Sequence, residues 1–485
     1  MDHRNINRRT FLKLSTAIAA TTALPFVPGC TPARQEADRT VDVAIIGAGL
    51  AGLTAARQLV AQGIESVLVI EAQDYVGGRL RDVQVNDTTI IEAGGQFIGP
   101  PQTRILELAA ELGVETYRIF EEGDAVYHLD GDTTRFPPYD FAVFGEYDRI
   151  RLMLDGMAQT VPLGAPWNAP DAEMLDNMSF GDFLDANLSD PIARDLFDII
   201  SFSILNAFPP DLSLLYVLFF IHSCVDINTL VATEGGAQDS RFLGGAQLVP
   251  IRMAAELGEE RVLLQSPVRS IHHDDTSIQI VSDRAVVDAQ YAIVAMMPSI
   301  IRNITFEPSL PDQRQGLIEN WPISGDFKVN VVYETPFWRE QGFSGFIGQS
   351  DRVAASFGYD NSPPDADVGI FVTWPNIGAD PSLADPDNRR EAVLNSIAAY
   401  FGDQALDPID YLEHDWTDNE WIPACVSPVG EGLLTQYGPA LLQPVGRIHW
   451  AGTETSPIWN GYMEGAVRSG DRVAEEVAAL ILANR

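Results

Sequence analysis

The sequence contains few cysteines, almost no lysine and no surplus of positive charge. Only three of its 485 residues are cysteine, and after Cys30 only Cys224 and Cys425 remain, so at most one bridge can form and a disulfide framework is excluded. The formal net charge of −37 excludes a nucleic-acid partner, because the phosphate backbone would be repelled. The acidity either favours cationic ligands or only keeps the protein soluble, and both interpretations stay open.

Long hydrophobic runs are missing after the N-terminal region. A membrane-spanning helix needs about 20 consecutive apolar residues. The nearest candidate, LSLLYVLFFIHSCVDI, contains His222 and Asp226 and is predicted to be a buried helix instead. The length of the chain exceeds what one hydrophobic core can fill, which predicts two interleaved domains.

The first 30 residues are predicted to be an export signal rather than part of the fold. In NRRTFLK the paired Arg8 and Arg9 precede a modest apolar run, which is the pattern of twin-arginine export, a route for proteins already folded around a cofactor. The segment VPGC resembles a lipoprotein cleavage box, with residues 31–40 as a polar linker. Two alternatives stay open: a lipid anchor at Cys30 that tethers a periplasmic protein to the membrane, or a plain cleaved signal.

The mature part opens with the pattern of a dinucleotide-binding site. VDVAIIGAGLAGLTAARQLVAQGIESVLVIEA predicts a strand, a glycine turn, a helix and a second strand. Gly47 permits the tight turn, Gly49 lets the backbone approach a pyrophosphate, and Gly52 lets the helix pack against the sheet. The helix begins at Leu50 and Ala51, whose N-terminal end would face the phosphates.

Two further features after this turn indicate which dinucleotide is bound. Glu71 follows the second strand at the distance expected of a carboxylate that holds a ribose diol. Gly77, Gly78 and Arg79 form a GGR segment that favours a flavin over a nicotinamide, because Arg79 can neutralise the pyrophosphate of a permanently held FAD.

The C-terminal region has a second feature suited to a flavin. Gly461, Tyr462 and Met463 immediately precede the predicted helix EGAVRSGDRVAEEVAALILA. The positive end of this helix can stabilise negative charge that develops on a reduced flavin, with the Met463 N–H as the expected donor. The Tyr462 ring is expected to stand on the flavin face.

Lysine is nearly absent, so its single occurrence in the mature chain is informative. The 31 basic residues are 29 arginines and two lysines, Lys13 in the signal and Lys328 in the segment FKV. An ammonium is a compact donor that can meet a single water, whereas a guanidinium is a broad planar fork. Retention of lysine at this position therefore predicts a functional side chain.

Together these segments resemble the flavin-containing amine oxidases, and the monoamine oxidases in particular. The resemblance runs from Val41 to the C-terminus and includes EAGGQFIGPPQTRILELAAELGVETYR, SRFLGGAQLV, LQSPVRSI, FKV, ETPFW, LLTQYG and HWAGTETSPIWNGYMEGAVRSGDR. It implies a two-domain α/β fold, with a Rossmann-type FAD-binding domain and an α+β substrate domain. The expected FAD-binding pieces are 41–100, 240–300 and 440–485, and the expected substrate-domain pieces are 101–239 and 301–439.

The resemblance also implies roles for individual residues. Lys328 would hold a water on flavin N5, and the backbone of Val268 would hold the adenine end. The remaining flavin contacts would come from two glycine-containing segments, namely Gly94, Gly95 and Gln96 under the flavin, and Gly452, Thr453 and Glu454 along the ribityl and pyrophosphate portion.

The chain departs from the monoamine oxidases at one wall of the substrate site. Those enzymes have two parallel tyrosines in front of the flavin; Tyr462 matches one, and Val426 occupies the position of the other. Trp416, Phe97 or another aromatic residue would have to supply the missing ring. Gln238 aligns with a cavity glutamine if one inserted residue is allowed.

Cys425 lies nine residues after Trp416, the interval at which the monoamine oxidases attach their flavin covalently. Three interpretations stay open: covalent attachment of FAD, a buried thiol, or a bridge to Cys224.

The expected function is oxidation of an amine to an imine by FAD, with O2 reduced to hydrogen peroxide, no metal and no general base. Two other enzymes fit the same motifs: a flavoprotein that desaturates C–C bonds, and an amine dehydrogenase that uses another electron acceptor. A redox-inactive FAD protein that binds partners at the membrane is a third alternative. The identity of the amine and the choice between monomer and homodimer are not determined by the sequence.

Overall fold

The computed structural model describes residues 34–484, except 88, 139, 142–143, 326, 350–353, 365–366 and 378–379. The predictions for Arg8, Arg9, Lys13 and Cys30 therefore lie outside the described residues. Residues from Ala37 onward form one compact unit.

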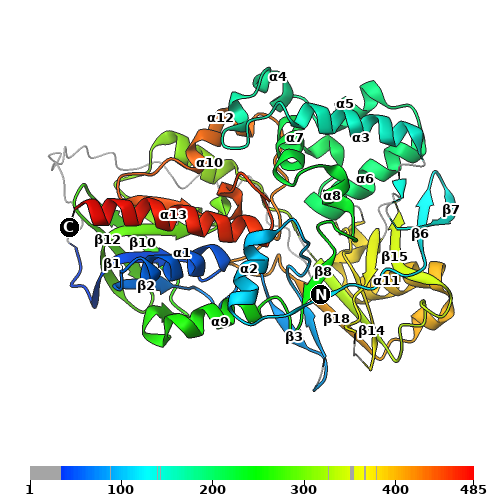
Figure 1. Cartoon of the computed structure of the whole chain (residues 1–485), viewed down its shortest axis with the longest axis horizontal. Helices are drawn as coiled ribbons and strands as arrows, with labels where there is room; N and C mark the ends of the chain where they lie inside the picture. The colour runs from blue at the N-terminus through cyan, green and yellow to red at the C-terminus, as the bar shows by residue number, and fades with distance from the viewer. Residues whose placement is uncertain are drawn as a thin grey trace, which may run out of the picture. The chain divides into compact units, whose positions relative to one another are not determined.

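The two strands predicted around the glycine turn are neighbours in an eight-stranded sheet, and the predicted helix connects them (Figure 1). Strand β1 (Arg39–Ile46) pairs in parallel with β2 (Val67–Ile70) on one side and with β12 (Val286–Ala295) on the other, so that Ile45 lies opposite both Val69 and Ile293. The run of Val, Ile and Ala in β1 and β2 has no polar alternation, which is typical of strands buried on both faces.

The order of this sheet is β13-β10-β11-β12-β1-β2-β9, and β19 pairs with β12. Its remaining strands are β9 (Val262–Leu263), β10 (Val268–His273), β11 (Ile278–Ser282), β13 (Thr305–Glu307) and β19 (Ile448–Ala451). The helices α1 (Leu50–Ala61) and α13 (Met463–Ala483) lie side by side over it.

A second sheet has seven strands in the order β18-β14-β17-β16-β15-β6-β7. Its strands are β6 (Asp124–Leu129), β7 (Asp132–Phe136), β14 (Phe327–Tyr333), β15 (Phe343–Gln349), β16 (Phe357–Asp360), β17 (Gly369–Thr373) and β18 (Asp410–Asp415). Strand β14 is the predicted FKV strand, and it is antiparallel to both of its neighbours. Two small two-stranded sheets join β3 (Asp82–Gln84) to β4 (Ile90–Glu92) and β5 (Thr116–Arg118) to β8 (Ser240–Phe242).

The other helices fall into two sets. Those that gather at the upper right of Figure 1 are α3 (Gly145–Ala158), α4 (Ala172–Asp176), α5 (Phe180–Asn187), α6 (Pro191–Leu205), α7 (Leu214–Ser223) and α8 (Ile227–Val231). Those placed elsewhere are α2 (Thr103–Glu111), α9 (Leu248–Leu257), α10 (Asp312–Asn320), α11 (Pro386–Phe401) and α12 (Leu433–Tyr437).

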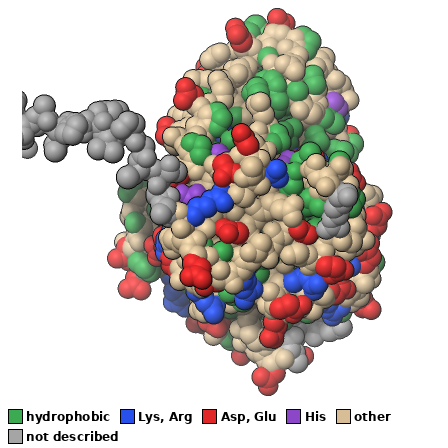
Figure 2. Space-filling view, turned by 90° about the vertical axis from the view of Figure 1, so that its left-hand side faces the viewer, with side chains coloured by type: hydrophobic (Ala, Val, Ile, Leu, Met, Phe, Trp, Pro, Cys, Tyr) green, Lys and Arg blue, Asp and Glu red, His purple; other side chains and the backbone are tan. Residues whose placement is uncertain are grey.

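The predicted buried helix around LSLLYVLFFIHSCVDI is α7, in which every residue from Leu214 to Ser223 is buried except His222. Among the described residues, no helix has both the length and the apolar character needed to cross a membrane. On the face drawn in Figure 2, acidic side chains are spread among basic ones rather than gathered in a single patch.

The proposed domain boundaries stay a prediction. Strand β13, inside the segment assigned to the substrate domain, pairs with β10 in the first sheet. This pairing favours a third boundary after Glu307 rather than after residue 300.

Candidate functional site

A cavity of about 320 Å³ lies where the carboxyl ends of β1, β2 and β12 meet the N-termini of α1 and α13. Its wall includes most of the residues that the sequence suggests as flavin contacts, namely Gly47, Gly49, Leu50, Ala51, Glu71, Gly78, Arg79, Gly94, Gly95, Gln96, Val268, Cys425, Gly452, Thr453 and Met463. Gly52, Glu454, Lys328 and Trp416 lie behind the wall, while Tyr462, Gln238 and Val426 are part of it.

The glycine turn before α1 is built by close approaches of the backbone. Gly47 has φ +105°, and a Cβ there would lie 2.6 Å from the Ala295 oxygen. A Cβ on Gly52 would lie only 2.0 Å from the Gly47 oxygen, so the first turn of α1 requires glycine at this position. A Cβ on Gly49 would meet nothing nearer than 3.9 Å, although Gly49 lines the cavity. The backbone here leaves space that a ligand can occupy.

The N-terminus of α1 has no side chain that caps it. Its first N–H groups are therefore available to an anion at the cavity wall. Next to it, Glu71 accepts hydrogen bonds from the N–H of Ala48 at 2.6 Å and of Gln73 at 2.8 Å, one on each carboxylate oxygen. Burial raises the pKa of Glu71. Each carboxylate oxygen keeps acceptor capacity, so the group can still receive two hydroxyls.

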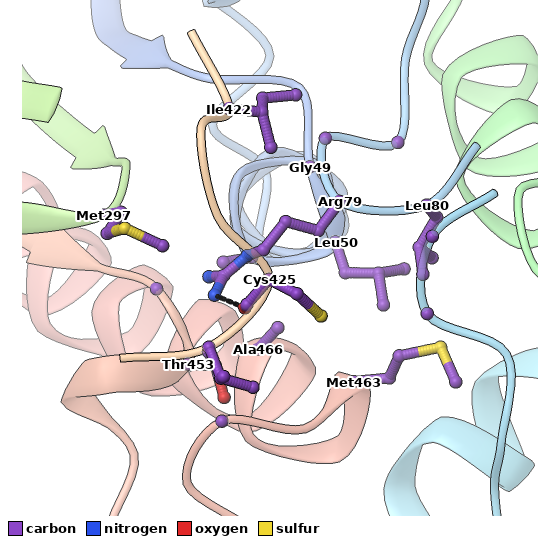
Figure 3. Close-up of a pocket in the computed structure, with 18 of the residues that line it drawn as sticks. Gly49, Leu50, Arg79, Leu80, Met297, Ile422, Cys425, Thr453, Met463 and Ala466 are labelled. Atoms are coloured by element: carbon purple, nitrogen blue, oxygen red, sulfur yellow. Dashed lines mark hydrogen bonds between the residues drawn. The ribbon is translucent and has the colours of Figure 1, made fainter. Parts of the chain in front are cut away.

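Arg79 connects three parts of the chain that are distant in sequence. Its Nη1 donates to the Cys425 carbonyl at 2.8 Å (Figure 3). Its Nη2 lies 2.9 Å from a Glu454 carboxylate oxygen. Cys224 is buried, and neither it nor Cys425 forms a disulfide. The alternative of a bridge between the two cysteines is therefore wrong, whereas the Cys425 thiol lies in the cavity wall.

Helix α13 begins against the cavity. Tyr462 is its N-cap and no side chain caps its first turn, as at α1. The Tyr462 carbonyl accepts a hydrogen bond from the Thr453 hydroxyl at 2.9 Å. The Tyr462 ring lies 6.1 Å from Phe220 and 5.0 Å from Trp459, and burial raises its pKa well above the usual value.

Lys328 extends from β14 to the segment that follows β4. Its Nζ donates to the Gly94 carbonyl at 2.7 Å and to the side-chain oxygen of Gln96. The ammonium also lies 5.3 Å from the centre of the Trp374 ring. Burial lowers the pKa of Lys328 to about 7, an effect that the negative charge of Glu92 opposes.

Trp416 supports this segment from outside the cavity. Its indole N–H donates to the Ala93 carbonyl at 2.9 Å, and its ring lies 3.1 Å from where a Gly94 Cβ would be. Trp416 is not among the residues that line the cavity, and its suggested role in place of the missing second tyrosine stays a prediction.

Gln238 is part of the wall. Its amide N–H donates to the Leu230 carbonyl at 3.2 Å, while its side-chain oxygen is buried and has no partner among the described residues. The expected cavity position of Gln238 thus holds in the structure, although its role stays a prediction.

Most of the aromatic wall has no signature in the sequence. It consists of Phe97, Phe220, Phe357, Tyr359, Trp374 and Tyr462; Trp421, which also lines the cavity, is not counted as part of it. Tyr359 lies 5.2 Å from Phe97, and Phe357 stacks on Trp374 at 4.7 Å. Sequence patterns suggest only Phe97 and Tyr462, because the other rings lie on α7 and β16 or directly after β17, and their direction toward the cavity depends on tertiary packing. Aromatic residues in buried strands carry no signal that separates a cavity wall from a core.

These groups fit FAD. Two uncapped helix N-termini, a glycine turn, a carboxylate and a guanidinium surround one cavity, and they match the phosphates and the ribose diol of a dinucleotide. In the described part of the chain, no three His, Cys, Asp or Glu side chains lie together as ligands for a metal.

Comparison with known proteins gives consistent results. Residues 50–478 match the profile of the family described as flavin containing amine oxidoreductase, and residues 5–25 match that of the twin-arginine translocation signal. The chain is 38% identical over 447 residues to a protein of Mycobacterium tuberculosis named as a flavin-containing monoamine oxidase, covering 91% of this chain and 97% of that one.

Two solved structures share the fold. A cyclohexylamine oxidase from Brevibacterium oxydans is 35% identical with a TM-score of 0.86, covering 91% of this chain and 99% of that one. A putrescine oxidase bound to putrescine is 33% identical with a TM-score of 0.85 and the same coverage.

Proposed function

Because this chain belongs to the family of flavin containing amine oxidoreductases and is an FAD-dependent amine oxidase, we propose that its substrate is a monoamine whose carbon body is apolar. When bound, FAD supplies the acceptor for the two electrons and the hydrogen lost from the amine α-carbon, and O2 is the oxidant that becomes hydrogen peroxide. The imine that remains hydrolyses to an aldehyde or a ketone.

This proposal rests on one observation about the charges that line the cavity. Glu71 is the one Asp or Glu among the described residues of the cavity wall, and it is held beside the glycine turn by Ala48 and Gln73. Apart from Glu71 and Arg79, the polar side chains that line the cavity together with the aromatic wall, such as Gln238, are neutral. A diamine such as putrescine would bring a second ammonium into this wall without a carboxylate to pair with it, and burial of an unpaired charge is costly.

The aromatic wall would also select the protonation state of the substrate. An apolar surrounding disfavours the ammonium form of an amine and therefore favours the neutral form, whose nitrogen lone pair is needed for oxidation. The unpartnered oxygen of Gln238 would accept an N–H of the neutral amine and orient it. Tyr462 and the neighbouring rings would exclude water from the α-carbon.

A carboxylate, two helix N-termini and a guanidinium would each hold a different part of the cofactor. Glu71 would bind the ribose diol, the N-termini of α1 and α13 would bind the pyrophosphate and the electron-rich part of the flavin, and Arg79 would add a positive charge. The Lys328 ammonium would hold a water in front of the flavin and favour reduction of O2 by its charge. Cys425 would provide a covalent attachment point in the same wall.

The substrate class is tested with a matched pair of amines. Anaerobic bleaching of the flavin by n-butylamine or cyclohexylamine should be at least tenfold faster, at equal concentration, than bleaching by putrescine. Faster bleaching by putrescine would contradict the monoamine proposal. Absence of bleaching by every amine, with retention of bound FAD, would favour the C–C desaturase alternative.

Export follows the twin-arginine route. We further infer a periplasmic location with a lipid anchor at Cys30, since VPGC precedes a polar linker.

A further inference from the structure

The hydrogen bonds of Lys328 are the beginning of a longer chain of buried side-chain amides. Gln96 receives a hydrogen bond from the lysine on its oxygen and donates from its nitrogen to the Asn361 side-chain oxygen at 2.8 Å. Asn361 in turn donates from its side-chain nitrogen to the Asn330 side-chain oxygen at 2.9 Å. All four side chains belong to residues that are at most 3% exposed.

The lysine determines the direction of this chain. An ammonium can only donate hydrogen bonds, so the Gln96 atom that faces Lys328 must be the oxygen. The Gln96 nitrogen then faces Asn361, which must present its own oxygen, and the same reasoning turns the Asn361 nitrogen toward Asn330. One donor-only group thus orients three amides, each of which could otherwise adopt two orientations.

The chain of amides also closes on itself. Lys328 and Asn330 are two residues apart on β14, so their side chains lie on the same face of the strand. Asn361 follows β16 and is fixed by its own backbone, with its N–H donating to the Ile370 carbonyl at 2.7 Å and its carbonyl accepting from Arg241 at 2.6 Å. The chain of amides thus begins and ends on β14. At its beginning the Lys328 ammonium donates to two acceptors, the Gly94 carbonyl and the Gln96 side chain.

We propose that Gln96, Asn361 and Asn330 form a positioning relay that keeps the Lys328 ammonium charged and oriented for the reaction with O2. The catalytic part of this proposal rests on the proposed role of Lys328, whereas the relay itself does not. Without an acceptor at Gln96, burial would favour the neutral amine, because a hydrogen bond to a charged donor offsets much of the lost hydration.

Other charged and titratable groups near the ammonium also influence whether Lys328 is charged. Glu92 on β4, Asp82 on β3 and Cys425 favour its charged form, whereas Arg241 on β8 disfavours it, and His414 on β18 has its own pKa lowered in part by Lys328. Glu92 and Arg241 form a buried ion pair, and the two charges shift the pKa of Lys328 in opposite directions. Replacement of Gln96 removes the hydrogen-bond acceptor of Lys328 and leaves all of these charged groups in place.

The scarcity of lysine makes the relay directly measurable. With ¹³C-labelled lysine the full chain gives two side-chain resonances, from Lys13 and Lys328, and Lys328→Met removes and thereby assigns one of them. We expect Gln96→Leu to lower the titration midpoint of the Lys328 resonance by about one pH unit and Asn361→Leu to lower it by less. The isosteric Gln96→Glu should raise it.

Gln102→Leu is the matched control, because Gln102 is a buried glutamine in the same segment whose side-chain atoms have no partner among the described residues. An unchanged midpoint in both Gln96→Leu and Asn361→Leu, or an equal change in Gln102→Leu, would overturn the relay. If Gln96→Leu does not fold, Asn361→Leu and Gln96→Glu decide the question.

Kinetics separate the relay from the role of Lys328. A midpoint lowered by one pH unit from about 7 reduces the charged fraction at pH 7 about fivefold, so reoxidation by O2 should slow about fivefold in Gln96→Leu. In Asn361→Leu, whose side chain is not among those that line the cavity, reoxidation should slow in proportion to its smaller change of midpoint while anaerobic reduction by the amine is unchanged. A lowered midpoint with unchanged reoxidation would keep the relay and overturn the part assigned to Lys328.

Discussion

Replacement of Lys328 by methionine tests whether a buried ammonium accelerates the reaction with O2. Methionine keeps the length and volume of the side chain and removes its charge and its hydrogen bonds to Gly94 and Gln96. A positive charge in a site of low dielectric constant stabilises the anion formed when O2 accepts its first electron. We expect reoxidation to slow about a hundredfold, which corresponds to about 2.7 kcal/mol of transition-state stabilisation.

The pKa of Lys328 adds a second, independent expectation. Because burial lowers this pKa to about 7, about 90% of the lysine is charged at pH 6 and about 10% at pH 8. The rate of reoxidation in the unmodified enzyme should therefore fall about tenfold between these two pH values. In Lys328→Met the rate should be flat over the same range.

Stopped-flow absorbance measures both half-reactions separately. Anaerobic mixing with the amine gives the rate of flavin reduction, and mixing of the reduced enzyme with O2 gives the rate of reoxidation. The reasoning is refuted if Lys328→Met slows both half-reactions equally, which would indicate a structural role. It is also refuted if reoxidation does not depend on pH between 6 and 8 in the unmodified enzyme.

Three further outcomes are expected. Gly52→Ala should abolish FAD retention, because its Cβ would lie 2.0 Å from a backbone oxygen. Gly156→Ala is the control, because a Cβ there meets nothing within 4 Å, and it should change the free energy of unfolding by no more than about 1 kcal/mol. FAD content and thermal melting measure the two outcomes. In Cys425→Ser the flavin should appear in the supernatant after acid precipitation, while the unmodified protein keeps it, and a yellow supernatant from the latter would refute covalent attachment. Cys30→Ala should release a soluble exported protein, and replacement of both signal arginines by lysine should retain the precursor inside the cell. Cell fractionation measures both outcomes, and an unchanged distribution of the protein would contradict the corresponding prediction.

Local patterns predicted the parts of the site that depend on backbone geometry. The glycine turn, Glu71 and the start of α13 are each specified by a few consecutive residues, and the positive φ of Gly47 and the tight contact of Gly52 agree with the reasons given for those glycines. Composition makes the solitary Lys328 conspicuous, whereas its role at flavin N5 is implied only by the family resemblance of the FKV segment.

The parts that local patterns do not predict depend on tertiary packing. Tyr359 lies on β16 and Asn361 directly follows it, and their positions beside Phe97 and Gln96 arise only when this strand is placed in the second sheet. Trp416 was suggested only as a ring that could replace the missing tyrosine; it is not among the residues that line the cavity and its indole donates to the Ala93 carbonyl, so that role stays a prediction. Sequence spacing gives the order of the residues but not the side of the wall on which they lie.

The wall of the cavity is assembled from both ends of the chain. Its first residues belong to the turn before α1, and its last, Met463 and Ala466, lie within about 20 residues of the C-terminus. The site is therefore complete only when segments about 400 residues apart in the sequence have come together, so bound FAD would tie the turn before α1 to α13. We expect a chain cut before α13 to lose the last part of this wall and, with it, the bound FAD.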